Sequence, residues 1–438
     1  MILGVNSIVK YLIMKKNKFL QRFLFGLLFL VLIPFSCSQK KTIELESERL
    51  NIILDSYVEN GIYPFLYARI EDKDDVVYEY SSINHNLLGN FKINGDTWMR
   101  IWSMSKLITI SLAMDLKEEG LLSLNDPVIK FIPEFSNLKV AVDEDGKSIS
   151  QIDENILDCP HILVETDSIM TIKHLMNHKA GFYYALTNSQ CLNSSIELLD
   201  IPNLKNGEEL IKQLSNLPLI QHPGEKYTYG LNTTVLGLVL QRITGKNLNE
   251  MVSERILDTQ NIEGLSYRLP ENVDLIPCYT GRDGTLRNVI DGDLDIFGQS
   301  VPNYLLNNNL FLGGEGMLGT GKGYIDFMKL FSLDNKIKFL NNETIVEMIS
   351  KPDIENNNYG YNTDYAFYLT SKNHEFEKNI LRVGGYEKTS SWIDQNNKLF
   401  GVLFAQVNET QDKIGLSTQM EIDFKKELYH QLNKIKEN

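Results

Sequence analysis

Cysteine is scarce in this chain of 438 residues, which contains only four. No two cysteines have the C-x-x-C spacing, so neither a cysteine-ligated zinc site nor a thioredoxin-like motif is predicted. Beyond Cys37 the chain has Cys159, Cys191 and Cys278. Three cysteines allow one disulfide if the protein is exported, and the sequence leaves its pairing open.

The chain also has little continuous hydrophobic sequence. One apolar run covers 13 residues, 23–35. It is too short for a transmembrane helix, but it follows a basic cluster and is typical of a signal peptide. Ser36-Cys37-Ser38 then predicts cleavage before Cys37 and a lipid on that cysteine, although Pro34 departs from the usual aliphatic residue. We therefore expect a signal peptide over 1–36 and a polar tether over 37–42; the alternative is an ordinary signal peptide with an incidental cysteine.

Basic residues are outnumbered, with 43 Lys and Arg against 57 Asp and Glu, and a net charge of −14. Removing 1–36 would take away five basic residues and no acidic one, which makes the charge more negative still. This balance argues against nucleic acid, and against an anionic membrane surface, as a partner of the folded part.

His174 and His178 lie four residues apart but lack the Glu of the zinc-protease motif, so we expect no metal and no cofactor.

The hydrophobic periodicity changes twice along the chain. It predicts a sheet region at both ends, about 43–120 and 365–438, and a mainly helical region over about 121–364. Because the predicted strands are sequential with short links, the sheet should be largely antiparallel. The expectation is a single α/β domain of the α+β type over 43–438, with a helical insertion and a cleft beside the sheet. The predicted helices are 43–60, 103–120, 171–178, 205–214, 231–244, 248–256, 324–332, 342–350 and 419–432, and the predicted strands are 64–70, 76–80, 366–370, 380–384, 389–393 and 399–406.

A Ser-x-x-Lys pattern begins at Ser103 and opens an apolar run of helical period. A serine and a lysine three residues apart on a helix lie on one face, where the amine can receive the hydroxyl proton. The pattern occurs four times, but only at Ser103 does it stand between a strand-like run and a long helix. The alternative is a helix N-cap serine followed by a solvated lysine.

Several further stretches, taken in order with the serine, resemble the β-lactamase-related serine hydrolases, which include class C β-lactamases, D,D-peptidases and β-lactamase-fold esterases. The resemblance runs from about residue 50 to 410 and implies a β-lactamase/transpeptidase-like fold. The matching stretches are Arg100-Ile101-Trp102-Ser103-Met104-Ser105-Lys106, Asp126-Pro127-Val128 with Pro133-Glu134-Phe135, Met170 to Gly181, Pro223-Gly224-Glu225 with Tyr229 and Val235-Leu236-Gly237, Gly313-Gly314-Glu315-Gly316-Met317, and Gly384-Gly385 with Thr389 and Trp392-Ile393-Asp394.

The resemblance implies roles for these positions. Ser103 would be the acylating nucleophile, Lys106 its activating partner, and Tyr229 the proton-shuttling phenol, with Tyr227 as a competing assignment. The backbone N–H groups of Ser103 and Tyr386 would form the oxyanion hole. Substrate would also lie against the residues that align with the family's binding motifs, which are Asn232, Val383, Gly384 and Gly385.

Three departures from the family bear on the substrate. Asn232 is displaced by one position from the Y-x-N pattern, and no E-x-x-L-N or S-D-N motif of class A β-lactamases occurs. Val383 stands where K-T-G would supply a cation, and Arg382 should point to the other side of the strand. Lys388-Thr389-Ser390 is a rival for K-T-G. The missing cation favours esters, or amides without a free carboxylate, over β-lactams.

The sequence thus predicts an exported, lipid-anchored serine hydrolase of a bacterial cell envelope, acting through an acyl-enzyme on ester or amide substrates. Two alternatives stay open. One is a D,D-peptidase or β-lactamase acting on peptidoglycan stems or β-lactams. The other is a non-catalytic binding protein that keeps the fold.

If Cys37 carries the lipid, Cys37→Ala should move the protein from the membrane fraction to a soluble or uncleaved form. A single acyl chain binds membranes only marginally, so a stable anchor requires several chains on that cysteine. Fractionation of cells expressing each form, followed by immunoblotting, measures the change. An unchanged distribution would instead indicate an uncleaved hydrophobic anchor.

Overall fold

The structure is a computed structural model, and it describes residues 43–290, 292–293, 296–298, 309–334, 338–350, 361–362, 365–369, 380–409 and 416–437. The predicted signal peptide, the tether and Cys37 lie outside these residues. Among the helices of the described part, none is long and apolar enough to cross a membrane.

The central element is a seven-stranded sheet with the strand order β10-β11-β12-β13-β14-β1-β2. Each described pair of neighbours is antiparallel, and the two chain ends meet where Tyr67 of β1 pairs with Phe404 of β14. The predicted antiparallel sheet built from both ends of the chain is therefore confirmed. Its strands are β1 (Phe65–Glu71), β2 (Val76–Ile83), β10 (Tyr361–Asn362), β11 (Phe367–Leu369), β12 (Ile380–Gly385), β13 (Thr389–Asp394) and β14 (Leu399–Phe404).

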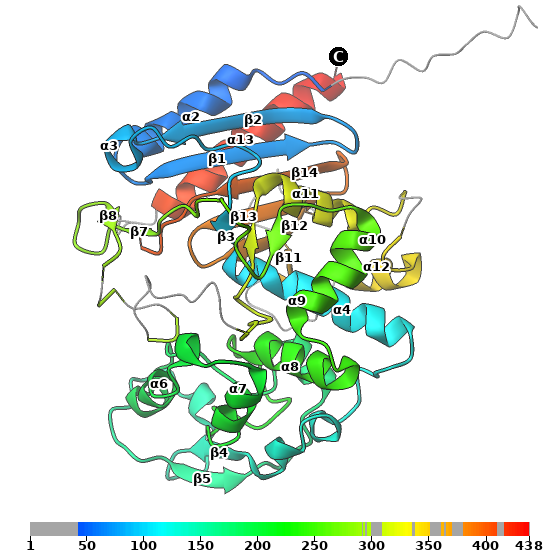
Figure 1. The fold of residues 1–438 in the computed structure, drawn as a ribbon. Coiled ribbons are helices and arrows are strands. Elements are labelled where there is room, and N and C mark those ends of the chain that lie inside the picture. The colour runs from blue at the N-terminus through cyan, green and yellow to red at the C-terminus, as the bar shows by residue number, and fades with distance from the viewer. Residues whose placement is uncertain are drawn as a thin grey trace, which may run out of the picture. The chain divides into compact units, whose positions relative to one another are not determined.

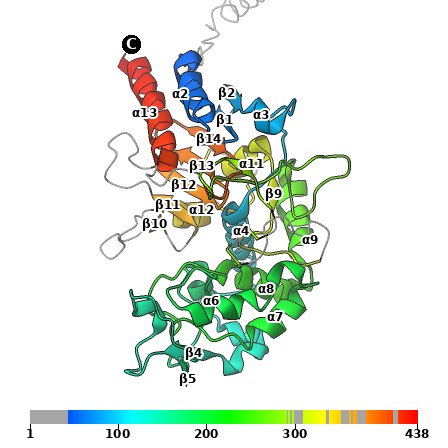
Figure 2. The ribbon, with the colours of Figure 1, turned by 90° about the vertical axis from the view of Figure 1, so that its left-hand side faces the viewer.

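Helices cover both faces of this sheet. The terminal helices α2 (Ser47–Glu59) and α13 (Leu416–Glu437) lie side by side on one face, and α11 (Gly321–Met328) and α4 (Ser105–Glu118) lie on the other (Figures 1 and 2). The Tyr57 hydroxyl on α2 donates to Asp423 on α13 at 2.7 Å. On the sheet, Trp392 packs edge-on against Phe424 of α13, with ring centroids 6.5 Å apart. The two chain ends therefore share one layer.

The helical region between the two sheet-forming parts packs on α4 through α8. Nearly every residue of α4 is buried, because this helix is enclosed between the sheet and the helical region. Two of its three buried hydroxyls bond to backbone carbonyls, Thr109 to Gly313 at 2.6 Å and Ser111 to Leu107 at 2.7 Å. The remaining helices are α3 (His85–Leu88), α5 (Ile172–Met176), α6 (Gln190–Glu197), α7 (Gly207–Leu214), α8 (Asn232–Thr244), α9 (Leu248–Val252), α10 (Asp258–Gln260) and α12 (Asn342–Ile349).

Small sheets also form outside the seven-stranded sheet, and among their strands the sequence pattern indicated only the strand-like run before Ser103. The polar stretch after residue 140 contains a two-stranded sheet, and the short strand β3 before Ser103 pairs with β9. Helix α6 was also not predicted; its polar sequence is started by Ser189, whose hydroxyl accepts from the Leu192 amide. These strands are short and depend on distant partners, which local periodicity does not reveal. They are β3 (Met99–Arg100), β4 (Lys139–Val142), β5 (Ile162–Glu165), β6 (Leu265–Ser266), β7 (Tyr279–Thr280), β8 (Arg287–Asn288) and β9 (Leu318–Gly319).

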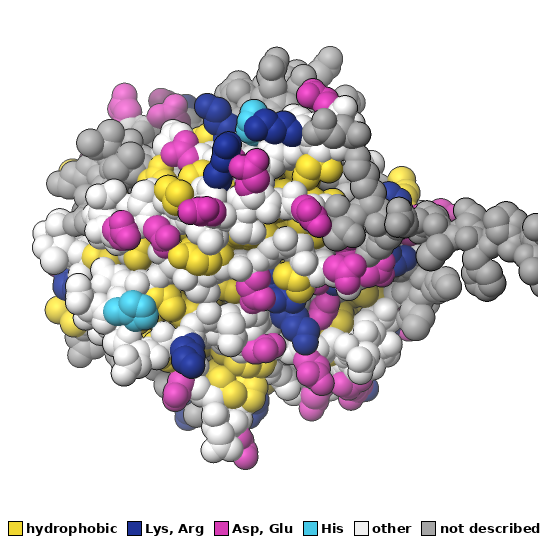
Figure 3. Space-filling model, turned by 90° about the horizontal axis from the view of Figure 1, so that it is seen from above, with side chains coloured by type: hydrophobic (Ala, Val, Ile, Leu, Met, Phe, Trp, Pro, Cys, Tyr) yellow, Lys and Arg dark blue, Asp and Glu magenta, His cyan; other side chains and the backbone are white. Residues whose placement is uncertain are grey.

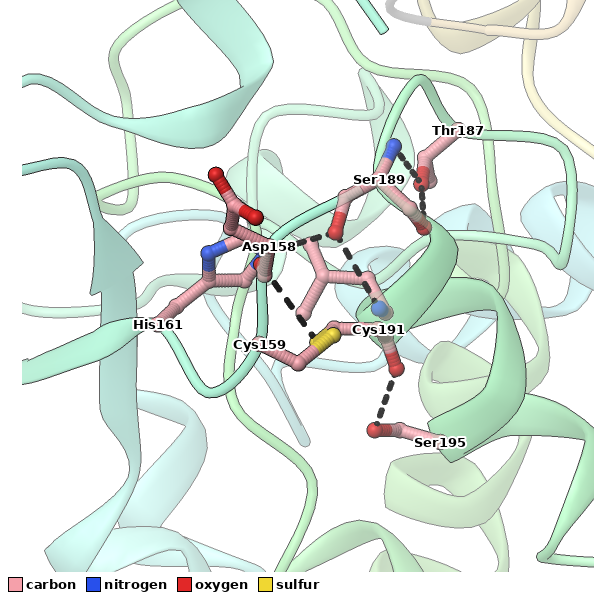
Figure 4. Close-up of a disulfide and its surroundings, with 8 residues drawn as sticks. Asp158, Cys159, His161, Thr187, Ser189, Cys191 and Ser195 are labelled. Carbon is pink, nitrogen blue, oxygen red and sulfur yellow. Dashed lines mark hydrogen bonds between the residues drawn. A yellow bond between two sulfur atoms is a disulfide. The ribbon is translucent and has the colours of Figure 1, made fainter. Parts of the chain in front are cut away.

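The cysteine pairing left open by the sequence is Cys159 with Cys191, and Cys278 is a buried free thiol. The disulfide joins the loop before β5 to the start of α6 (Figure 4). Beside it, the His161 ring and the Ser189 hydroxyl are hydrogen-bonded at 2.6 Å, so the same loop is held to the helix twice.

On the face of the molecule seen in Figure 3, acidic side chains are spread widely and alternate with Lys and Arg. An ion-pair network lies on β1 and β2, in which Arg69 bonds to Glu71 at 2.5 Å and to Glu79 at 2.7 Å. Lys329 also bonds to Glu71 at 2.5 Å. Basic side chains in this network are therefore neutralised by carboxylates.

Gly401 of β14 is required by close packing, since a Cβ built there would lie 2.1 Å from the Trp392 ring. Gly401→Ala should lower the free energy of unfolding by about 1–3 kcal/mol through overpacking. Denaturant unfolding of the purified protein measures this. Trp392→Phe removes the part of the indole that the new methyl group would meet, so adding it to Gly401→Ala should restore part of the lost stability. If the stability losses of the two single variants were strictly additive in the double variant, the explanation would be contradicted.

Candidate active site

Ser103 lies in a 3₁₀ turn, Trp102–Met104, that leads directly into α4. The sequence placed it in the helix itself, but the turn gives Trp102 a positive φ of 46°. The Ser103 side chain meets two of the predicted partners. The Tyr229 hydroxyl donates to its Oγ at 2.7 Å, and the Lys106 Nζ lies 3.2 Å from the same atom.

Of Tyr229 and Tyr227, it is Tyr229 whose hydroxyl bonds to Ser103, which favours the assignment of Tyr229. His178 holds the Tyr229 segment. Its backbone carbonyl accepts from Thr228 at 2.8 Å, and its Nδ1 accepts from the Gly230 amide at 3.4 Å. The rings of His178 and Tyr229 are 4.7 Å apart. Burial, together with the charge of Lys106, keeps the pKa of His178 well below its usual range, which suits a neutral ring accepting at Nδ1.

Lys106 is 1% exposed and is surrounded by acceptors. Besides Ser103, its Nζ bonds to the Gly314 carbonyl at 2.8 Å, the Tyr184 hydroxyl at 3.0 Å and Glu315 Oε1 at 3.2 Å. Burial lowers the pKa of Lys106, and the carboxylate of Glu315 opposes that shift. A lowered pKa increases the share of neutral amine near neutral pH, and neutral amine can take a proton.

The end of β12 approaches the Ser103 turn very closely. A Cβ at Gly385 would lie 2.6 Å from the Ile101 carbonyl and 2.2 Å from Thr389 Oγ1, so only glycine fits. The next residue, Tyr386, packs edge-on against Trp102 with ring centroids 5.3 Å apart. Both predicted oxyanion residues, Ser103 and Tyr386, line the same cavity.

The predicted substrate-binding residues separate into two groups. Gly384 and Gly385 line the cavity, whereas Val383 is 2% exposed and is not among the described residues that line it. Asn232 is also fully buried, and its amide donates to the Phe182 carbonyl at 2.9 Å. Both side chains are therefore part of the packing behind the site. Lys388, in the turn after β12, does not line the cavity within the described part either, which favours Gly384-Gly385 over Lys388-Thr389-Ser390 as the motif equivalent.

Arg382 was expected to point away from the site. It contributes to the cavity wall, but its guanidinium bonds to Glu421 on α13, on the opposite face of the sheet. With Lys425, this arginine lowers the pKa of Glu421 to about 2, although burial opposes the shift. The charge of Arg382 is therefore already paired.

The cavity has a volume of about 700 Å³ and opens above Ser103. A second cavity of about 360 Å³ shares Tyr184, Leu186, Tyr227 and Tyr229 with it. Aromatic and aliphatic side chains dominate the shared wall, so the space favours an apolar ligand. The described lining of the first cavity consists of Ser103, Tyr184, Leu186, Tyr227, Tyr229, Ile296, Arg382, Gly384, Gly385 and Tyr386.

No group of three or more His, Cys, Asp or Glu suitable for a metal ion occurs among the described residues. His174, spaced four residues from His178, instead closes a capping box on α5 with Thr171.

Two residues of the site were not identified as functional from the sequence. Glu315 was noted only as part of the Gly-Gly-Glu-Gly turn, and Tyr184 carried no motif at all. A carboxylate inside a glycine turn, with no cation near it in sequence, was the available signal for Glu315. Its partner, Lys106, lies 209 residues away in the sequence.

The fold is that of the β-lactamase/transpeptidase-like proteins. A model of the Beta-lactamase family matches residues 55–421. The chain belongs to the Beta-lactamase family, as its motifs predicted.

Among curated proteins, lovastatin esterase of Penicillium rubens is 27% identical over 245 residues, which is 54% of this chain and 54% of that protein. Monacolin J acid methylbutanoyltransferase of Aspergillus terreus is 26% identical over 262 residues, 59% of this chain and 58% of that protein. The chain spans about half the length (55%) of the first curated relatives it matches.

Two solved structures share the fold. EstCE1, a hydrolase with promiscuous acyltransferase activity, superposes with a TM-score of 0.67 at 19% identity, covering 87% of this chain and 98% of that one. The simvastatin synthase LovD of Aspergillus terreus also gives a TM-score of 0.67 at 19% identity, covering 88% and 98%. The fold is therefore shared by a hydrolase with acyltransferase activity and by a simvastatin synthase.

The fit of Gly385 against the Ser103 turn generates a test. Gly385→Ala should reduce acylation of Ser103 about tenfold or more, because the added methyl group would push β12 away from the turn. Gly384→Ala is the matched variant, since its Cβ would meet nothing closer than the Thr389 carbonyl at 3.4 Å, and it should lose less. Rates of labelling by a fluorophosphonate measure both. Equal losses would show that the approach of Gly385 is not what matters.

Proposed function

We propose that this protein is a serine hydrolase that forms an acyl-enzyme on Ser103 and acts on neutral esters, or on amides without a free carboxylate. The observation that carries the proposal is the contact of Ser103 Oγ with both Tyr229 and Lys106 at the floor of the cavity. A serine hydroxyl becomes nucleophilic when bases are held beside it in this way.

In the first step, Ser103 Oγ attacks the substrate carbonyl, and its proton passes to the Lys106 and Tyr229 pair. The carbonyl oxygen takes up negative charge and faces the backbone N–H groups of Ser103 and Tyr386. The bond to the leaving group then breaks, and Tyr229 returns the proton to the departing alcohol or amine. Water repeats the sequence on the acyl-enzyme, which releases the acid and restores Ser103.

The described cavity wall favours neutral substrates. Arg382 is the one Lys or Arg among the described residues that line it, and its guanidinium is paired with Glu421. A carboxylate-bearing substrate would therefore find no available cation there, which disfavours β-lactams and peptidoglycan stems. The names of the relatives, an esterase and acyltransferases, point in the same direction. If an alcohol replaced water in the second step, the same site would transfer the acyl group.

We further propose that the protein is exported, lipid-anchored at Cys37 and located in a bacterial cell envelope. The Cys159–Cys191 disulfide supports this, because structural disulfides persist in oxidising compartments. In this proposal the membrane contact comes from the lipid, and nucleic acid is not a partner of an acidic surface.

Ser103→Ala should abolish both turnover and fluorophosphonate labelling, while the fold stays intact. Ser111→Ala is the matched control, since Ser111 is a buried serine of the helix that follows Ser103, and its hydroxyl bonds to the Leu107 carbonyl. The assay compares short-chain nitrophenyl esters, a chromogenic cephalosporin and D-amino-acid peptides. Faster turnover of the cephalosporin or the peptides would indicate the β-lactamase or D,D-peptidase alternative. Absence of turnover and labelling in the wild type would indicate a binding protein.

A further inference from the structure

Glu315 is a carboxylate in an unusual place, 2% exposed and inside a turn between two glycines. A buried charge is costly unless it is paired and hydrogen-bonded. Three side chains supply hydrogen bonds to it. Lys106 lies 3.2 Å from Oε1, the Tyr184 hydroxyl donates to Oε1, and the Thr234 hydroxyl donates to Oε2.

The directions of these bonds indicate the ionised form of Glu315. The Gly314 amide can only donate, and it donates to Thr234 Oγ1 at 3.1 Å, so the Thr234 hydrogen points to the carboxylate. The Tyr184 hydroxyl accepts a hydrogen bond from Lys106 at 3.0 Å and donates one to Glu315 Oε1. Each oxygen of Glu315 is thus used as an acceptor, as an ionised carboxylate requires.

The turn that carries Glu315 is also fixed from two helices. The Gly313 carbonyl accepts from Thr109 on α4 at 2.6 Å, and the Gly314 carbonyl accepts from Lys106 on the same helix at 2.8 Å. Thr234 on α8 holds the other side. The carboxylate therefore stays beside the amine without depending on the substrate.

We propose that Glu315 is a positioning residue for Lys106: it holds the amine against Ser103 and sets how much of that amine is protonated. The inference rests on the proposed function for its catalytic consequence. Burial by itself lowers the pKa of Lys106 and favours the neutral amine, and the adjacent carboxylate counteracts this. Both protonation states of the amine are then accessible, which a group that receives and returns a proton needs.

Glu315→Gln tests the proposal because it keeps the size and removes the charge. Loss of the carboxylate makes Lys106 easier to deprotonate, so whichever limb of the pH profile of kcat/KM reports Lys106 should move to lower pH, by about one unit or more. Turnover of a neutral nitrophenyl ester near pH 7 should nevertheless fall about tenfold, because the amine is no longer held against Ser103. Glu315→Asp retains the charge, so the limb of its pH profile that reports Lys106 should stay nearer to the position of that limb in the wild type.

The matched control is Asp115→Asn, which removes a different carboxylate of α4 that pairs with Arg255 at 2.5 Å, away from the cavity. Its pH profile should coincide with that of the wild type even if its thermal stability falls. A purely structural role for Glu315 would lower activity equally at every pH. The proposal is therefore overturned if neither limb moves in Glu315→Gln.

A second measurement does not depend on turnover. In protein labelled with ¹³C at the lysine ε-carbon, the Lys106 signal is assigned by its loss in Lys106→Ala and then titrated by NMR. Lys106 should titrate at lower pH in Glu315→Gln than in the wild type, and an equal midpoint overturns the inference. If the wild type neither turns over esters nor reacts with the fluorophosphonate, the proposed function fails, while this titration still decides the role of Glu315.

Discussion

The site depends on keeping the Lys106 amine buried beside Ser103. Removing an amine from water favours its neutral form, and a lone buried ammonium would be strongly unfavourable. The protein meets this constraint with a carboxylate, a phenol and a backbone carbonyl, all within 3.2 Å of Nζ. The glycine turn before Glu315 and the placement of Tyr184 both follow from this requirement.

The fold brings these groups together from distant parts of the chain. Helix α4 and the 3₁₀ turn before it supply Lys106 and Ser103 from between the sheet and the helical region, and β12 reaches the same turn from the C-terminal part. The Tyr229 segment is held by the neutral ring of His178, which packs on Tyr229 at 4.7 Å. Ser103, Lys106 and Tyr229 are therefore each held by contacts from other parts of the chain, which favours a preorganised site.

The paired state of Arg382 connects the architecture with the chemistry of the substrate. Its guanidinium lies on the α13 side of the sheet, bonded to Glu421, and Val383 is packed in the interior. The cavity wall is consequently rich in Tyr, Leu and Ile side chains and glycine backbone. Such a wall fits the apolar part of an ester better than a carboxylate, and it is compatible with hydrolysis or with acyl transfer.

The sequence by itself determined the family, the antiparallel sheet built from both chain ends, and Ser103 and Lys106 as neighbours, because these depend on local period and on motifs in order. It could not pair Cys159 with Cys191 or find β4, β5 and α6, since each depends on contacts between distant segments. Val383 and Asn232 were expected at the cavity, yet packing buries both side chains. The tertiary structure alone placed Glu315 against Lys106, because nothing within one turn of either residue records a partner 209 positions away.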